Sequence, residues 1–482
     1  MPFTDFRFLL LFFPITIGLY QLLPKQFRLW FVVLAGLVYL WLSQPFYLVF
    51  FVVYILLNFL LGLLLQRVRG KDLLSNFVLG VALLLNLGLL AALKLLVDNP
   101  TGLSNVLAVQ FIKTEVSSSP WIFPLGFSYI AFQVIAYFLD IKNEVTPAEK
   151  NLLKFSALLL FFPKMVAGPI QRYRNSADQL DFLSGSPERV AEGIRRFIRG
   201  LAKKVLIADV IAKFINPVFG QTTPAITTIQ AWLVLLGYAI QLYYDFSGYT
   251  DMALGIGETF GFRLVENFNL PYVSKSVTEF WRRWHISLSS WFRDYVFIPL
   301  QFHFRRQKWY PIQASILIIF LLTGIWHGTD RHYIVWGLML GVIIGFEASK
   351  PGKRLQKLWA PLQHLWMVFW ILMSWVLFRS TSLQFALAYY KALFGLQGQV
   401  TPLPFSQTIP FPVAENSVKL AFIFGIAFAL PVIPWLKSRF SGDKIPLLWA
   451  TVAKDIGLLL LLVYCLGLIA AGGPMPGIYG QF

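Results

Sequence analysis

The sequence predicts an all-α, polytopic membrane protein. Of its 482 residues, 57% are hydrophobic and only 13% are charged, whereas soluble domains carry roughly a quarter charged residues. Apolar runs near the length of about 20 residues that crosses a bilayer recur early in the chain, at residues 6–23, 29–42, 46–65 and 77–97. Continued along the sequence, the pattern predicts about 10–12 transmembrane helices together with re-entrant and amphipathic helices.

The charged breaks between the apolar runs predict the orientation. The first break contains Lys25 and Arg28, and the third contains Arg67, Arg69 and Lys71. Because Lys and Arg concentrate in cytoplasmic loops, both breaks are expected inside and the N-terminus outside. The fourth break, residues 98–120, is then expected outside as well. The net charge of +18 then reflects contact with anionic lipid headgroups, so membrane lipids are expected partners and nucleic acid is not.

Two segments do not look like simple spans. Residues 155–170 are apolar but interrupted by prolines, a glycine and Lys164, which favours a re-entrant segment covered by protein. In residues 191–214, arginines and the pair Lys203 and Lys204 alternate with apolar residues at helical spacing. This pattern predicts an amphipathic helix on the cytoplasmic surface, with both lysines on its charged face.

Several functional classes are disfavoured by what the sequence lacks. Cys465 is the single cysteine, which excludes an intrachain disulfide and a Cys/His metal cluster. The first apolar run has no cleavage site of small residues, so it is expected to stay in the protein. There is no G-x-S-x-G, H-E-x-x-H or P-loop motif, and no bound metal or cofactor is expected.

Residues 312–326 are expected to cross the membrane outward, residues 327–332 to turn and residues 333–346 to return. His327 is the first candidate for chemistry, in the segment Trp326-His-Gly-Thr-Asp330 at the end of the first of these apolar runs. It lies 16 residues beyond Pro311, or about 24 Å along a helix, which places it nearer the outer face than the inner one. An imidazole can take a proton from a hydroxyl and return it. On the residues alone, a catalytic base and a helix-packing hydrogen-bond partner remain equally good interpretations.

The second candidate is the segment from Glu279 to Tyr295, the densest in polar and aromatic residues. Its spacing predicts one helix with an aromatic face and a polar face that carries His285. Acyl transfer from a thioester needs a base, donors for the developing oxyanion and positive charge for the phosphates of a coenzyme A donor. These roles would fall to residues of both candidate segments, namely His327, Trp326, Trp281, Arg282 and Arg283.

At these residues the chain resembles the membrane-bound O-acyltransferase (MBOAT) family, within the bacterial group that holds the alginate O-acetylation and teichoic-acid D-alanylation membrane proteins. The resemblance covers residues 120–345, and the final residues 478–482 also fit. The matching stretches are Phe123 to Gln133, Phe161 to Tyr173, Tyr244 to Ala253, Glu279 to Tyr295 and Thr323 to Gly328.

The resemblance implies a role for each candidate. His327 corresponds to the proposed catalytic histidine, and His285 to the second site residue. The implied fold is a ring of helices around a buried tunnel. The donor, acetyl-CoA or an acyl carrier protein thioester, would enter from the cytoplasm. The acceptor would be an extracytoplasmic polysaccharide or a secreted SGNH/esterase-like partner protein, and the location the bacterial inner (cytoplasmic) membrane.

The neighbouring candidates each have a structural alternative. Asp245 and Asp251 line the site, or they tie a broken helix together through backbone N–H groups beyond a span at residues 232–244. Arg282 and Arg283 meet donor phosphates, or they pair with Glu279 and lipid headgroups. Trp281 and its neighbours Trp284 and Trp291 are expected mainly to pack, and residues 266–272 to form a structured turn.

The acceptor stays open at this stage. Residues 329–336 look closer to the D-alanylation branch and residues 194–208 closer to the alginate branch, and Leu340-Gly341 stands where many relatives have His-Gly. The alternatives are D-alanyl transfer to teichoic acid from a carrier protein, a transporter or flippase, and a scaffold without chemistry. Inverted repeats, which a transporter would show, are not detected. The expected organisation is one membrane domain, with N-terminal helices in residues 1–120, a catalytic core in 121–348 and C-terminal helices in 349–482.

Overall fold

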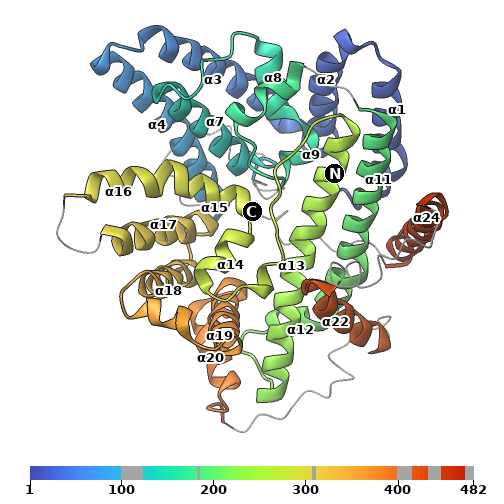
Figure 1. The fold of residues 1–482 in the computed structure, drawn as a ribbon, viewed down its shortest axis with the longest axis vertical. Helices are drawn as coiled ribbons and strands as arrows, with labels where there is room; N and C mark the ends of the chain where they lie inside the picture. Colours follow the sequence, from blue (N-terminus) through green and yellow to red (C-terminus); the bar gives the residue numbers. More distant parts are fainter. Residues whose placement is uncertain (99–122, 182–184, 307–310, 399–414, 433–446, 473–482) are drawn as a thin grey trace, which may run out of the picture. The chain divides into compact units, whose positions relative to one another are not determined.

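The fold is all-helical in the part of the chain that the structure describes. The structure is a computed structural model, and it describes residues 1–98, 123–181, 185–306, 311–398, 415–432 and 447–472 (Figure 1). Within these residues every named element is a helix, and one isolated bridge joins Phe268 to Trp284. The all-α prediction is therefore confirmed.

Five of the described helices are long and apolar enough to cross a membrane. They cover Lys25–Ser43, Pro45–Val68, Asp72–Leu95, Ala360–Arg379 and Thr451–Gly472, and three shorter apolar helices cover Arg7–Leu22, Pro311–His327 and Asn416–Ala429. The total of about 10–12 spans stays a prediction. The expected outer loop at residues 98–120 and the terminal residues 478–482 lie outside the described residues, apart from Asp98.

The chain divides into two compact units. The first contains the described residues up to Phe197 together with Met252–Val265, and the second contains Ile198–Asp251 and the described residues from Glu266 onward. The elements of the first unit are η1 (Arg7–Phe12), α1 (Phe13–Leu22), α2 (Lys25–Ser43), η2 (Pro45–Tyr47), α3 (Leu48–Val68), α4 (Asp72–Asp98), α7 (Phe127–Lys142), α8 (Leu152–Leu160), α9 (Phe162–Met165), η3 (Tyr173–Asn175) and α10 (Ala177–Asp181).

Polar side chains join the apolar helices α3 and α4 inside the first unit. The Nδ2 group of Asn86 on α4 donates to Oδ1 of Asn58 on α3 at 2.8 Å, and the hydroxyl of Tyr54 donates to Asn86. All three side chains are buried. Lipid tails are as apolar as leucine, so such hydrogen bonds and close packing hold membrane helices together. The predicted spans at 46–65 and 77–97 are confirmed as helices that pair in this way.

The apolar stretch at 155–170 is broken, as predicted. Helix α8 ends at Leu160, α9 covers only Phe162–Met165, and the chain after it is irregular and buried. Lys164 is fully buried and donates to the side-chain oxygen of Gln133 on α7. The segment lies against the start of α7. A Cβ on Gly126, the residue before this helix, would be 1.3 Å from the carbonyl oxygen of Met165, so only glycine allows this approach. The re-entrant path through a membrane stays a prediction.

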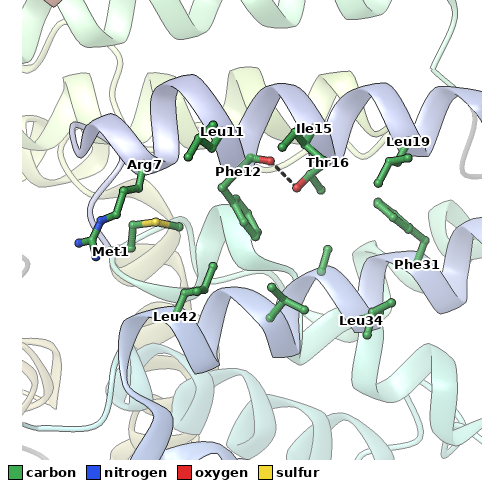
Figure 2. Close-up of a pocket in the computed structure, with 12 residues that line it drawn as sticks. Met1, Arg7, Leu11, Phe12, Ile15, Thr16, Leu19, Phe31, Leu34 and Leu42 are labelled. Carbon is green, nitrogen blue, oxygen red and sulfur yellow. Dashed lines mark hydrogen bonds between the residues drawn. The ribbon is translucent and has the colours of Figure 1, made fainter.

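An apolar groove of about 430 Å³ lies between η1–α1 and α2 (Figure 2). Leu11, Ile15 and Leu19 face Leu34 and Leu42 across it. Its lining is almost entirely aliphatic or aromatic, which suits contact with lipid tails and not proton transfer. None of the predicted site residues lines this groove. All of them belong to the second unit.

The second unit carries the candidate site. Helix α11 (Pro187–Ala202) leads into it from the first unit. It is followed by η4 (Lys203–Ala208), α12 (Asp209–Phe219), α13 (Thr228–Thr259), η5 (Pro271–Val273), α14 (Val277–Arg283), α15 (Ile286–Phe292), η6 (Arg293–Phe297), α16 (Ile298–Phe304), α17 (Pro311–His327), α18 (Arg331–Glu347), η7 (Gly352–Lys357), α19 (Ala360–Arg379), α20 (Leu383–Leu393), α22 (Glu415–Ala429) and α24 (Leu447–Gly472).

Two expectations about this unit are wrong. Helix α13 does not break after Tyr244 but continues as one 32-residue helix through Asp245 and Asp251 (Figure 1). Lys204, expected on the charged face of the amphipathic helix, is buried. The reason is local, because residues 203–208 form a π-helix, whose wider turn shifts the faces relative to an α-helix.

Candidate active site

Helices α17 and α18 form a tight antiparallel hairpin that carries His327 (Figure 1). A Cβ on Gly324 would lie 2.5 Å from the carbonyl oxygen of Tyr333, and one on Gly337 would lie 2.3 Å from that of Phe320. Glycine at these positions lets the two backbones approach more closely than larger residues allow. The predicted pair of helices joined by a turn is confirmed, with the refinement that His327 is the last residue of α17 and not part of the turn. The outward direction of α17 across a membrane stays a prediction.

His327 lies in an aromatic enclosure. Its side chain is 7% exposed. The imidazole contacts the rings of Trp326 (4.6 Å between centroids), Trp336 (5.3 Å) and Phe378 (4.9 Å), the last two edge-on at 88° and 84°. These rings come from α17, α18 and α19, so tertiary packing shields the imidazole from water and limits its rotation.

His285 lies at a break in the polar aromatic segment, which corrects the prediction of one continuous helix. Its backbone has φ +45°, a left-handed conformation that is uncommon for a residue other than glycine. Helix α14 ends before it, and α15 begins after it. The side chain is 2% exposed and meets the ring of Phe246 edge-on at 4.8 Å.

The segment at residues 267–269 holds this break in place. The backbone N–H of Ile286 donates to the carbonyl oxygen of Asn267 at 3.0 Å, and the N–H of Ser287 donates to its side-chain oxygen at 3.1 Å. Two positions later, the N–H of Asn269 donates to the carbonyl oxygen of Arg283 at 3.0 Å. The expectation of a structured turn at residues 266–272 is confirmed, and this turn fixes the backbone on both sides of His285.

A chain of aromatic rings joins the two histidine segments within the second unit. Trp284, next to His285, contacts Trp375 at 5.2 Å, and Trp375 contacts Phe378 at 5.8 Å. Trp281 contacts Trp336 at 5.9 Å, so α14 packs on the same hairpin that carries His327. Among the described residues, the buried indole N–H groups of Trp281 and Trp336 have no hydrogen-bond acceptor. These contacts agree with packing as the main role of the tryptophans, while leaving two donors for a ligand.

Asp245 and Asp251 on α13 both pair with lysines of η4. The Nζ atom of Lys204 is 2.6 Å from Asp245 and 2.6 Å from Asp209, and that of Lys203 is 2.6 Å from Asp251. Burial alone lowers the pKa of Lys204, but the charges of Asp245 and Asp209 outweigh it and raise that pKa above its usual value. The carboxylates of Asp245 and Asp251 join α13 to η4 through these lysines, and Lys204 extends the connection to Asp209 at the start of α12. This supports a structural role for both carboxylates, and a role in lining the site stays a prediction.

The two arginines of α14 differ in their surroundings. Arg283 pairs with Glu279 at 2.9 Å and donates to the carbonyl oxygen of Asn269 at 3.2 Å. Arg282 is exposed. Its position leaves it available to an anionic group, whereas Arg283 is engaged within the fold. Contact of either with a donor phosphate stays a prediction.

Glu347 and Asn267 are site-region residues that the sequence interpretation did not identify. Glu347 is buried at the end of α18 and accepts hydrogen bonds from the start of α14. A lone acid at the end of an apolar run is the signal that could have identified it, because a buried carboxylate requires nearby donors. The signal for Asn267 was weaker, since Asn is common in turns. In the described part of the chain, no cluster of His, Cys, Asp and Glu suits a metal ion.

Comparison with known proteins finds similarity to one enzyme family over much of the chain. The MBOAT, membrane-bound O-acyltransferase family model matches residues 141–390. The chain is 35% identical to "Probable alginate O-acetylase AlgI" of Pseudomonas putida, over all of both chains. It is 37% identical to the protein of the same name from Pseudomonas aeruginosa, over 82% of this chain and 75% of that one. It is also 34% identical to "Teichoic acid D-alanyltransferase" of Bacillus subtilis, over 46% of this chain and 58% of that one.

The family model covers more than half of the chain, and it includes both histidine segments, the α17–α18 hairpin and the Lys204 ion pairs. The similarity to the two alginate O-acetylases extends over most or all of the sequence. The helical fold and the apolar spans agree with a multi-pass membrane enzyme. The chain therefore belongs to the membrane-bound O-acyltransferase family, and it is an O-acyltransferase.

Proposed function

We propose that the protein moves an acetyl group from a cytoplasmic thioester donor, acetyl-CoA, towards an extracytoplasmic polysaccharide or a secreted partner protein. The observation that carries the proposal is the placement of His327, buried at the tip of a hairpin inside an aromatic enclosure. The bacterial cytoplasmic membrane is the proposed location. A tunnel along the second unit would bring donor and acceptor to this imidazole from opposite sides.

The chemistry assigned to His327 is general base and then general acid catalysis. The imidazole takes the proton of the acceptor hydroxyl, and the oxygen forms a bond to the thioester carbonyl carbon. When the tetrahedral intermediate collapses, the carbon–sulfur bond breaks and the imidazolium returns the proton to the leaving thiolate. His285 serves as the second site residue, and the exposed Arg282 is the candidate for the donor phosphates.

The acetyl donor is preferred over D-alanine because of how much of the chain each comparison covers. The similarity to alginate O-acetylase spans the full length, whereas that to teichoic acid D-alanyltransferase spans less than half of the chain at similar identity. Outside the core shared with both groups, the chain is therefore similar to the first group, and this supports the acetyl donor. D-alanyl transfer from a carrier protein remains the second candidate.

A donor assay separates these candidates. Purified protein in vesicles is given either acetyl-CoA labelled in the acetyl group or a carrier protein loaded with labelled D-alanine. We expect hydrolysis or transfer of the label from acetyl-CoA at a rate at least 10 times that from the carrier. A preference for the D-alanyl carrier would contradict the acetyl assignment, and His327→Ala in the same vesicles is the background control.

The indole N–H of Trp336 is the proposed donor to the developing oxyanion, because it lies beside His327 and has no acceptor among the described residues. We expect Trp336→Phe to lower kcat by about 10²-fold or more, as loss of one oxyanion donor does elsewhere, with little change in KM. Trp370→Phe is the matched control. The indole N–H of Trp370 also has no acceptor among the described residues, but Trp370 lies on α19 and its ring contacts Trp366 and Phe369 instead of His327. An equal loss in both variants would indicate a packing role.

A further inference from the structure

Glu347 holds three helices of the second unit at one point. It is the last residue of α18 and is 6% exposed. Its Oε1 atom accepts from the backbone N–H of Val277 at 2.9 Å and from the indole N–H of Trp366 at 3.0 Å. Its Oε2 atom accepts from the N–H of Thr278 at 2.8 Å and from the hydroxyl of the same residue at 2.5 Å. Each carboxylate oxygen is thus used twice, by groups of α14 and α19.

These bonds complete the hydrogen bonding at the start of α14. The first N–H groups of a helix have no partner within the helix, and a buried N–H without an acceptor is costly. Glu347 accepts from the first two N–H groups of α14, and the hydroxyl of Ser276 accepts from the third, that of Glu279, at 3.0 Å. The start of α14 is therefore anchored to the end of α18 by a side chain that lies about 70 positions further along the chain.

The other end of α14 leads directly to His285. The helix ends at Arg283, Trp284 packs on Trp375, and His285 follows in its left-handed conformation. The helix itself, about 9 Å long at 1.5 Å per residue, and the extended Trp284 are all that separate the anchored start from this histidine. A seven-residue helix is too short to keep its position through its own hydrogen bonds. Its placement on the α17–α18 hairpin depends on its end contacts, of which Glu347 provides those at its start.

We propose that Glu347 is a positioning residue, whose carboxylate sets the register of the His285 segment against the hairpin that carries His327. The inference rests on the proposed function, because it takes both histidines to be parts of the site. It acts by geometry, since Glu347 lies at the end of α18 away from His327. A displacement of about 1 Å at reacting groups can reduce a rate about 10²-fold.

A double-mutant cycle tests this role. We expect Glu347→Ala to lower kcat about 10- to 100-fold with KM changed less than about 3-fold, while the same change in a His285→Ala background lowers kcat less than about 3-fold further. Residues that act through one another show such non-additivity. Equal fold-losses in both backgrounds would show that Glu347 only supports the fold, and would overturn the proposal.

Two further variants keep the test decisive. Glu347→Gln keeps one acceptor oxygen but turns an amide N–H₂ group towards the donors of α14, so its kcat is expected to lie between those of the wild type and Glu347→Ala. It replaces Glu347→Ala in the cycle if the alanine variant does not accumulate in membranes. The control variant is Glu144→Gln, which changes an exposed carboxylate of the first unit. It is expected to retain wild-type kcat. If His285→Ala alone leaves kcat unchanged, the site assignment fails at that single variant, and coupling through His285 fails with it.

Discussion

Replacing His327 with alanine is expected to lower kcat for acyl transfer by about 10²- to 10⁴-fold, the range that positioned proton transfer contributes in enzymes. The imidazole is the basic group at the centre of the enclosure formed by Trp326, Trp336 and Phe378, and alanine leaves an apolar space there. The measurement is transfer of labelled acetyl groups by purified protein in vesicles, with KM for the donor determined in parallel. Because His327 does not hold the donor, KM should change little.

The control for this prediction is His303→Ala. His303 lies on α16 and is exposed, so its loss removes a histidine without touching the enclosure, and wild-type activity is expected. Size-exclusion profiles and thermal unfolding of both variants establish that the proteins are folded. Undiminished transfer by a folded His327→Ala protein would remove the catalytic assignment, whatever the result for His303.

Replacing Lys204 with methionine is expected to reduce the free energy of unfolding by about 3–5 kcal/mol, because breaking a buried ion pair leaves charge without compensation. Here two carboxylates, Asp209 and Asp245, would lose the ammonium that lies 2.6 Å from each. We expect lower yield in membranes and a clearly lower midpoint of thermal unfolding in detergent. Activity per folded molecule should change far less than it does in His327→Ala.

Lys203→Met is the matched control, since the two lysines are adjacent in the chain. The Lys203 side chain is 31% exposed and pairs with Asp251, and partly exposed pairs contribute about 0–1 kcal/mol. The unfolding midpoint should therefore fall much less than in Lys204→Met. Equal losses in the two variants would show that burial of Lys204 between its carboxylates has no special weight. A further variant, Lys204→Met with Asp245→Asn, should recover part of the loss because one unpaired charge is removed.

The sequence predicted the α17–α18 hairpin well because every signal for it is local. An apolar run over residues 312–326, a polar turn over 327–332 and a second apolar run over 333–346 define two helices and their connection. The structure agrees to within one or two residues, with helices Pro311–His327 and Arg331–Glu347. Apolar runs at α3 and α4 were identified for the same reason. Where length and hydropathy decide an element, the sequence was sufficient.

The same local signals were misleading where tertiary contacts override them. The Trp spacing from Glu279 to Tyr295 predicted one helix, but residues 267–269 bind the backbone at residues 283–287 and open the helix at His285. The polar residues after Tyr244 suggested that the helix ends there, whereas Lys203 and Lys204 neutralise Asp251 and Asp245 and α13 continues. Partners far along the chain cannot be seen in the spacing of one segment.

The sequence by itself determined that this protein is a helical membrane enzyme and singled out the two histidines as candidate site residues by their motifs. Hydropathy indicates whether a helix lies in lipid or in water, and a motif indicates a chemistry that needs particular residues at a particular spacing. Only the tertiary structure decided what surrounds those histidines: the rings that enclose His327, the turn that fixes His285, and the carboxylate of Glu347 that ties α14 to the end of α18. The physical reason is that a buried polar group needs partners, and the fold, not the neighbouring sequence, supplies them.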